Sequence, residues 1–115
     1  MVRDWHLAVH DRLRRLFCDG LSTLADLQIA SDVPEAAIGT LERLIVKDDL
    51  REDAYRRLMT CLARTGRRDQ ALRHYRLVML LRDELDAEPE PATEDLAGRL
   101  LESATIGKTN LRPTS

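Results

Sequence analysis

Two histidines one helical turn apart come nearest to a metal site in this sequence. His6 and His10 fall within a helical pattern and would share one face of that helix. A zinc site needs at least a third protein ligand, and no glutamate lies between these histidines as it does in zinc peptidases. We therefore interpret both as solvated or capping side chains and expect no metal site.

The other reactive side chains do not form a catalytic pattern. Cys18 and Cys61 are far apart and belong to no metal-binding motif, so we interpret them as free, half-buried thiols in a reducing compartment. His74 lies in a basic helix and is expected at the surface. The sequence has no glycine-rich phosphate loop, no nucleophile elbow and no grouping of serine, histidine and acid. We expect no enzyme activity, no catalytic residue and no cofactor.

Basic residues are concentrated in one segment, which raises the possibility of nucleic-acid binding. Residues 51–82 carry a net charge of +6, and residues 83–104 carry −7. Phosphate contacts require such cations. Eight arginines are candidates: Arg51, Arg56, Arg57, Arg64, Arg67, Arg68, Arg73 and Arg76. They fall on different sides of two expected helices, however, and no recognition helix is present, so pairing with the acidic segment is the simpler interpretation.

The elements that position these side chains follow from an internal repeat of 34 residues. Six pairs of positions match in size: Leu21 with Tyr55, Leu24 with Leu58, Ala25 with Met59, Ala37 with Ala71, Leu41 with Tyr75 and Leu44 with Val78. This period is typical of the tetratricopeptide repeat, in which two antiparallel helices meet at a small residue. We expect an all-α, right-handed array of helical hairpins with about five helices, comprising two repeats and a C-terminal capping helix.

Apolar periodicity and helix-end signals give the expected boundaries. Asp32 with Glu35, and Asp49 with Glu52, suggest capping boxes before the second and third helices. Gly66 ends the third helix, because glycine adopts a positive φ most easily. The expected helices cover about residues 4–30, 34–46, 49–65 and 68–85, with a fifth from Pro91 through Leu96, Leu100 and Leu101.

The fifth helix is expected to cover the open apolar end of the array. Pro91 suits its first turn, and the segment after it loses apolar content towards the end of the chain. We expect one domain over residues 1–104 and a disordered tail over residues 105–115.

The repeat alignment also predicts which polar side chains face the concave groove of the array. The candidate partner groove comprises Asp19, Ser22, Asp26, Asp53, Arg56, Thr60 and Arg64. The lysine and asparagine residues that clamp a peptide carboxylate in some repeat proteins are missing from these positions. A partner site and a merely hydrated surface are equally compatible with the pattern.

Several runs of residues together resemble those of a known protein family. They are residues 50–59, 66–75 and 81–89, with Ala37, Leu41, Leu44, Pro91, Thr93 and Leu96. Residues 36–101 resemble the bacterial transcriptional activator domain of SARP-type antibiotic regulatory proteins. Asp49 stands where the family commonly has proline, and Asp86 where it has glycine, but an acid can cap a helix or tolerate the unusual backbone angle. The OmpR-type winged helix that normally precedes this domain has no counterpart in the sequence.

The resemblance implies a protein–protein interaction or oligomerisation domain of a bacterial transcriptional regulator, acting with a DNA-binding domain absent from this chain. Its partner would be a second copy or the transcription machinery, and DNA would be reached only through the other domain. An apolar seam on the first helix could close on a neighbouring copy, which would give a homodimer, or on a missing domain. The alternative is a general repeat scaffold for a peptide or other partner, unconnected with transcription. No apolar run is long enough to span a membrane, and we expect a cytoplasmic location.

Overall fold

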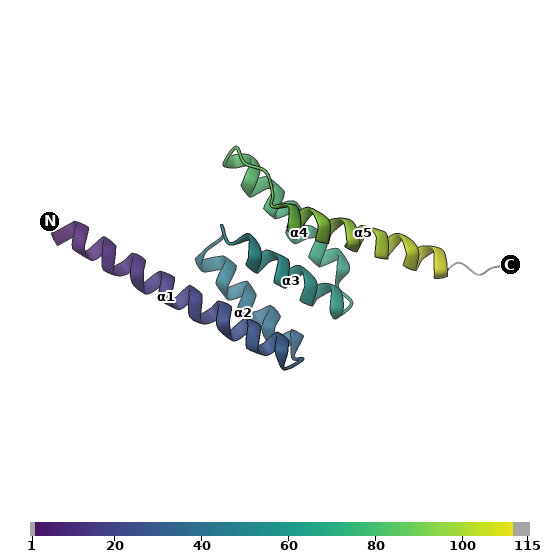
Figure 1. The fold of residues 1–115 in the computed structure, drawn as a ribbon, viewed down its shortest axis with the longest axis horizontal. Coiled ribbons are helices and arrows are strands. Elements are labelled where there is room, and N and C mark those ends of the chain that lie inside the picture. Colours follow the sequence, from purple (N-terminus) through teal and green to yellow (C-terminus); the bar gives the residue numbers. More distant parts are fainter. Residues whose placement is uncertain (1, 112–115) are drawn as a thin grey trace.

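A computed structural model describes residues 2–111, and the side chains of residues 5–102. Within this range the chain forms five helices and no strand: α1 (Val2–Ala30), α2 (Pro34–Lys47), α3 (Glu52–Arg64), α4 (Arg68–Glu84) and α5 (Pro91–Leu111). Figure 1 shows them stacked in chain order as hairpins. The predicted all-α array of helical hairpins is therefore confirmed.

The two repeats pack through the small residues that the alignment singled out. Ala37 on α2 and Ala71 on α4 are fully buried, in helices that pack against α1 and α3 respectively. A larger side chain at either position would push the helices apart. The core around them is aliphatic, and its largest fully buried members include Leu41, Leu58 and Met59. Aliphatic packing between successive helices thus fixes where the polar side chains of α1 and α3 lie.

Three helices end in the same backbone conformation. Asp32, Gly66 and Asp86 all have positive φ, at 59°, 82° and 55°. After each, the next residue donates its N–H to a carbonyl five residues earlier, as in Val33 to Gln28 (2.9 Å). Gly66 ends α3 as predicted, and Asp86 adopts the left-handed angle that its glycine-like position implied.

Both predicted capping boxes are wrong. Val33 and Arg51 occupy the N-cap positions of α2 and α3, and neither makes a side-chain capping hydrogen bond. Asp32 is committed to the left-handed turn that closes α1, so its carboxylate is not placed to cap α2. Glu52 is the first residue of α3 and is buried, and its carboxylate binds groups on α4 and at the start of α5.

Helix α5 begins at Pro91 as predicted and packs on α3 and α4. Leu96 and Leu100 are buried, whereas Leu101 is 53% exposed. The helix as described continues to Leu111, beyond the expected domain boundary at residue 104. Residues 112–115 lie outside the described part, and the disordered tail stays a prediction.

Candidate partner-binding site

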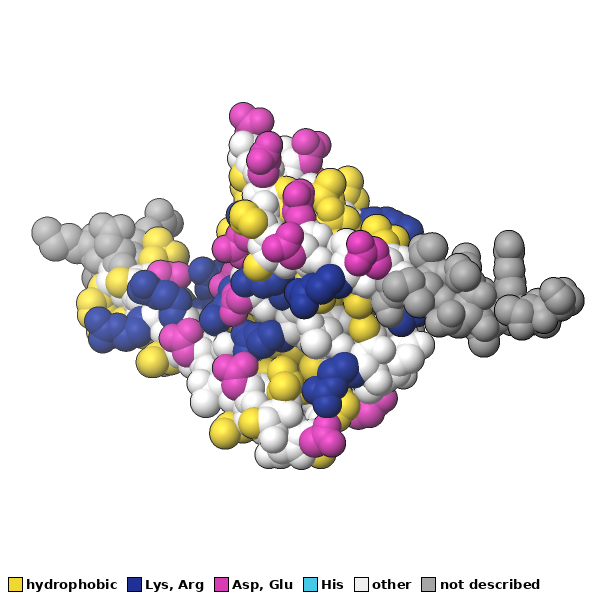
Figure 2. Space-filling view, turned by 45° about the vertical axis from the view of Figure 1, so that its right-hand side comes forward, with side chains coloured by type: hydrophobic (Ala, Val, Ile, Leu, Met, Phe, Trp, Pro, Cys, Tyr) yellow, Lys and Arg dark blue, Asp and Glu magenta, His cyan; other side chains and the backbone are white. Residues whose placement is uncertain are grey.

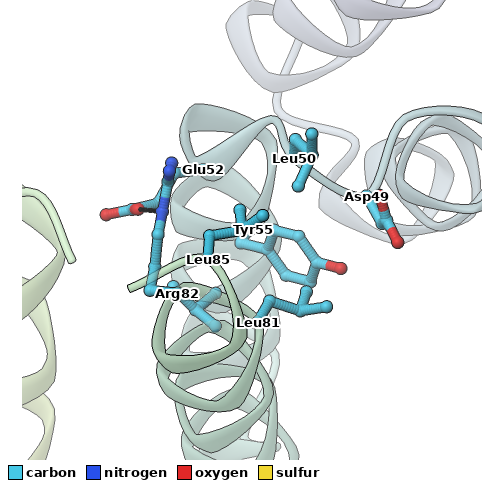
Figure 3. A pocket seen from close by; sticks show the side chains of 8 residues that line it. Asp49, Leu50, Glu52, Tyr55, Leu81, Arg82 and Leu85 are labelled. Atoms are coloured by element: carbon cyan, nitrogen blue, oxygen red, sulfur yellow. Dashed lines mark hydrogen bonds and ion pairs between the residues drawn. The ribbon is translucent and has the colours of Figure 1, made fainter. Parts of the chain in front are cut away.

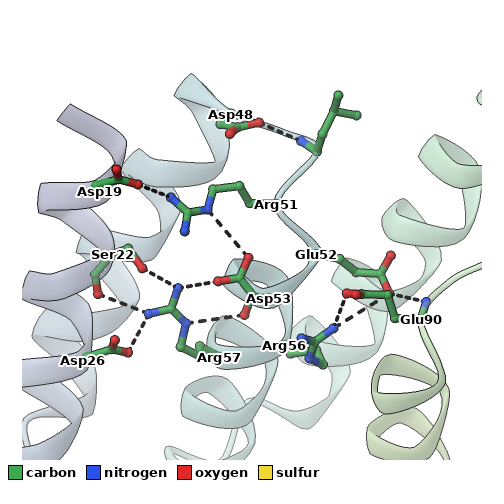
Figure 4. Close-up of polar contacts among 11 residues, drawn as sticks. Asp19, Ser22, Asp26, Asp48, Arg51, Glu52, Asp53, Arg56, Arg57 and Glu90 are labelled. Carbon is green, nitrogen blue, oxygen red and sulfur yellow. Dashed lines mark hydrogen bonds and ion pairs between the residues drawn. The ribbon is translucent and has the colours of Figure 1, made fainter. Parts of the chain in front are cut away.

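The residues predicted to line the groove come together on the inner side of α1 and α3. Arg57, which the repeat alignment did not select, lies at their centre (Figure 4). Its guanidinium donates to Asp26 Oδ1 at 2.6 Å, to Ser22 Oγ at 2.8 Å and to Asp53 Oδ2 at 2.9 Å. We call Arg57, Ser22, Asp26 and Asp53 the Arg57 cluster. It joins the C-terminal third of α1 to the first half of α3.

The other groove candidates also contact neighbouring residues. Asp19 accepts a hydrogen bond from Arg51 at 3.4 Å, and Thr60 donates to the Arg56 carbonyl one turn earlier at 3.0 Å. Arg64 at the end of α3 donates to Asp32 at 2.8 Å. The inner seam between α1 and α3 is thus a ladder of arginine–carboxylate pairs. Part of the predicted groove therefore works as a joint between helices.

A hollow of about 410 Å³ remains beside this ladder, between α1, α3 and α5. Four predicted groove residues line it: Asp26, Arg56, Thr60 and Arg64. Ile29 and Leu96 add apolar surface, and the exposed Arg99 of α5 adds a cation. A mixed lining of this kind suits a peptide segment better than a small metabolite, because it offers hydrogen-bonding groups spread along an open surface. We call it the inner groove.

A second polar cluster, which sequence reasoning missed, holds α5 in place. Glu52 is 4% exposed and accepts hydrogen bonds from Arg82 Nε at 2.6 Å, from the Glu90 backbone N–H at 2.5 Å and from Thr93 Oγ1 at 2.5 Å. Arg56 binds Glu90 Oε1 at 2.7 Å and Thr93 Oγ1 at 3.1 Å. We call these five residues the Glu52 cluster. It fastens the start of α5 to α3 and α4.

The charge of Glu52 is stabilised by these donors. Burial by itself would raise the pKa of the carboxyl, but the hydrogen bonds from Thr93, from the Glu90 amide and from Arg82, with the positive charge of Arg82, outweigh it and lower the pKa. The Glu90 amide directly precedes the first residue of α5, so the carboxylate also lies at the positive end of that helix. In the sequence Glu52 stands in a charged run between Arg51 and Asp53, so no local pattern indicates this role.

Two further hollows lie outside the inner groove. One of about 850 Å³ lies between α4 and the start of α5, with Tyr75, Met79 and Leu80 on α4 and Pro89 and Glu94 across from them. Met79 is 41% exposed there. Acidic side chains gather at this end of the molecule (Figure 2). The other hollow, beside Phe17 and Val46, is smaller, at about 360 Å³.

The pocket next to Tyr55 is too small for a ligand. Its volume is about 10 Å³, roughly that of one water-sized probe, and Leu50, Leu81 and Leu85 close it (Figure 3). Burial and the nearby Asp49 carboxylate raise the pKa of Tyr55, so the phenol stays protonated at neutral pH. This side chain acts in packing.

The remaining candidates for chemistry are separated from one another. Cys18 and Cys61 are free and fully buried, rather than half-buried as expected, and burial raises the pKa of the Cys61 thiol.

His74 is partly buried against Tyr55 instead of lying at the surface, and burial lowers its pKa. His6 lies edge-on against Trp5 at 5.5 Å. Among the described residues no three His, Cys, Asp or Glu side chains are grouped as metal ligands.

The arginines of residues 51–82 are largely paired with acids. Carboxylates bind five of the eight candidates for phosphate contact: Arg51, Arg56, Arg57, Arg64 and Arg67. Arg82 is paired as well, with Glu52. Dark blue and magenta side chains accordingly alternate over this face in Figure 2. A cation already held in an ion pair gains less from a phosphate contact than an unpaired one does.

Comparison with known proteins gives one match. The sequence model of a family described as the bacterial transcriptional activator domain matches residues 2–101. That range includes all of α1 to α4, both polar clusters and the inner groove. No curated protein and no solved structure matches the chain significantly.

Proposed function

The chain belongs to the bacterial transcriptional activator domain family, and we propose that it serves as a protein–protein interaction module of a bacterial transcription regulator. The observation that carries the proposal is the family match over residues 2–101. In this proposal a separate domain reads the DNA, and the helical array binds a partner in the cytoplasm. No helix among residues 2–111 is long and apolar enough to cross a membrane.

The inner groove supports this role as the place where a partner segment binds. Its lining combines the hydroxyl of Thr60 and the guanidinium of Arg99 with the apolar surface of Ile29 and Leu96. The Arg57 and Glu52 clusters hold α1, α3 and α5 around it. Preorganised walls lower the ordering cost of binding, so a short segment gains affinity without a large contact area.

Activation in this proposal arises from tethering. A regulator bound at a promoter holds its interaction domain next to the transcription machinery, so a contact of modest affinity becomes an intramolecular one. The effective concentration then reaches the millimolar range for short flexible linkers. The domain needs no catalytic group for this mechanism.

Binding assays with RNA polymerase subunits and with the rest of the regulator test the proposal. Immobilised chain should retain one of them, and Arg99→Glu should weaken that retention about tenfold by reversing a charge in the inner groove. Arg73→Glu is the matched control, because Arg73 is also exposed but lies on α4 away from the described hollows. If none of these proteins binds, or if both variants bind like the parent chain, the proposal is wrong.

A further inference from the structure

The hollow of about 850 Å³ between α4 and the start of α5 has an apolar floor, and we call it the α4–α5 hollow. Tyr75 and Met79 lie one turn apart on α4, with Leu80 next to Met79, and Pro89 lies across from them. Leu80 keeps 64% of its surface exposed. An exposed apolar surface with a polar rim is typical of an interaction site.

The rim of the α4–α5 hollow is acidic. Asp83 near the end of α4, Glu88 in the linker and Glu94 in the first turn of α5 supply three carboxylates. The guanidinium of Arg76 supplies the only positive charge of the lining, so the net charge of the lining is −2. Magenta side chains accordingly surround yellow ones at this end of the molecule in Figure 2.

The rim carboxylates differ from those of Glu52 and Glu90 in having no ion-pair partner. Glu52 binds Arg82, and Glu90 binds Arg56. In the part of the chain whose side chains are described, none of the three rim carboxylates forms an ion pair or accepts a hydrogen bond. A cation from outside the chain therefore meets carboxylates that need not first leave another partner.

The wall that the linker contributes is fixed at both ends. The Ala87 N–H donates to the Arg82 carbonyl at 2.9 Å, which closes the turn after α4. The Glu90 N–H donates to the Glu52 carboxylate at 2.5 Å, which fastens the other end. The backbone of Glu88 lies between these two points. A preorganised wall of this kind lowers the ordering cost of binding.

The distribution of charge and apolar surface selects the kind of ligand. The three carboxylates come from three different parts of the chain, and among the described residues no three acids are grouped as metal ligands. A single metal ion is therefore a poor match, and a polyamine would leave the apolar floor without a partner. A peptide with Lys or Arg side chains around one large apolar side chain matches both features. Its cations also suit the ring face of Tyr75.

We propose that the α4–α5 hollow binds a basic peptide segment of a partner protein, with one large apolar side chain on the floor and basic side chains at the rim. From Tyr75 to Asp83 the floor extends for about 12 Å at the rise of an α-helix, which matches about four residues of extended chain.

This inference goes beyond the proposed function because the α4–α5 hollow is separate from the inner groove. Leu96 and Arg99 of α5 line the inner groove, whereas Glu94 lines the α4–α5 hollow. Helical geometry places Glu94 on the opposite face of α5 from Leu96. Both sites are therefore open to ligands at the same time.

An NMR titration of the isotope-labelled 115-residue chain with a synthetic peptide tests the location. The probe is the acetylated and amidated peptide Lys-Arg-Trp-Lys-Arg. Its addition should shift the amide signals of residues 75–83 and 87–94 until they saturate. The largest shifts in the inner groove on α1 and α3, or no saturable shift anywhere, would overturn the proposal.

Charge variants test the rim in the same titration. Asp83→Lys should weaken peptide binding at least about tenfold, and a cation near the end of α4 suits the helix dipole. Glu84→Lys is the matched control, because it makes the same charge change on the neighbouring exposed residue, which does not line the hollow. It should weaken binding less than about threefold. An equal loss in both variants would show a response to net charge alone and overturn the proposal.

Changes to the apolar contact test the floor. Leu80→Ser should weaken peptide binding at least about tenfold, whereas Leu77→Ser, on α4 outside the hollow, should leave it within about twofold. The same peptide with glycine in place of tryptophan should bind at least about tenfold more weakly. Equal binding of the glycine peptide, or its displacement by equimolar spermine, would show a general polycation site and overturn the peptide proposal.

One further variant separates this inference from the proposed function. Arg99→Glu alters the inner groove and should leave the affinity for the basic peptide within about twofold. A chain that binds the peptide but retains no polymerase subunit or other part of the regulator would refute the proposed function alone. A chain that retains such a partner but does not bind the peptide would refute this inference alone.

Discussion

The Arg57 and Glu52 clusters both join α3 to a neighbouring helix, yet they differ in how they meet solvent. Arg57 is partly exposed, and its partners Asp26 and Asp53 keep 64% and 46% of their side chains exposed. Glu52 keeps 2% of its side chain exposed, and its partner Thr93 is fully buried. Water can replace the contacts of the first cluster but not those of the second. The comparison indicates that the C-terminal end of the array depends strongly on one buried charge, that of Glu52. The contact between α1 and α3 depends less on any single charge.

Truncation of Glu52 should therefore lower the free energy of unfolding more than truncation of Arg57 or Arg64 does. Glu52→Ala leaves Arg82, the Glu90 amide and Thr93 without their buried acceptor, and we expect the free energy of unfolding to fall by about 3–5 kcal/mol. Urea denaturation followed by circular dichroism measures it. Asp95→Ala is the control, since Asp95 is an exposed acid of α5, and should change stability by about 0.5 kcal/mol or less. A similar loss in both variants would show that Glu52 has no special role.

Arg57→Ala should cost less, about 1.5–3 kcal/mol, because hydrogen bonds to charged groups are lost but the carboxylates regain water. Arg57→Lys should recover only part of this loss, because one ammonium group cannot reproduce the fork that reaches Ser22, Asp26 and Asp53. The same denaturation assay applies, with the exposed Arg43→Ala as control. An Arg57→Ala loss as large as that of Glu52→Ala would remove the distinction between the clusters.

Acidic pH should distinguish the stability contributions of the two clusters further. The folded-state pKa of Glu52 is lowered from its ordinary value of 4.5, so its contribution to stability is fully present above about pH 4.5 and is lost as the pH falls through the folded pKa. Melting temperatures of the parent chain and Glu52→Gln, measured from neutral to acidic pH, should differ most near neutrality and converge in acid. A constant difference at all pH values would contradict the lowered pKa.

The smallest effect is expected for an exposed pair at the end of the same ladder. Arg64 and Asp32 are 46% and 80% exposed in their side chains, and their 2.8 Å ion pair should contribute about 1 kcal/mol or less. Arg64→Ala in the same assay should therefore change stability slightly, and added salt should reduce the difference. If Arg64→Ala lowered the free energy of unfolding more than Arg57→Ala does, the most stabilising pair of the ladder would be the one at Arg64 instead.

The sequence predicted the fold well because the fold depends on local periodicity. Ala37 and Ala71 are buried in the core, and Gly66 and Pro91 mark helix ends. These features follow from residue size, backbone angle and helical spacing, which a single chain displays directly.

The polar clusters were missed because their partners lie far apart in the chain. Arg57 contacts Asp26, which is 31 residues away, and Glu52 contacts Thr93, which is 41 residues away. In sequence Glu52 looked like a capping acid because it follows Asp49 by three residues, and only the docking of α5 gives it a different role. Arg57 was one arginine among eight, and no local pattern distinguishes the one that crosslinks two helices.

The hydrogen bond from the Glu90 amide to Glu52 has a consequence for how the molecule opens. In a stacked array each helix normally packs on the one before it. Here the start of α5 is also hydrogen-bonded to the first residue of α3, two helices back. Release of α5 must therefore break a contact at the start of the second repeat as well as those with α4. Exchange of the Glu90 amide proton with deuterium would report that release, and its rate should rise when Glu52 is removed while amides inside α2 remain protected.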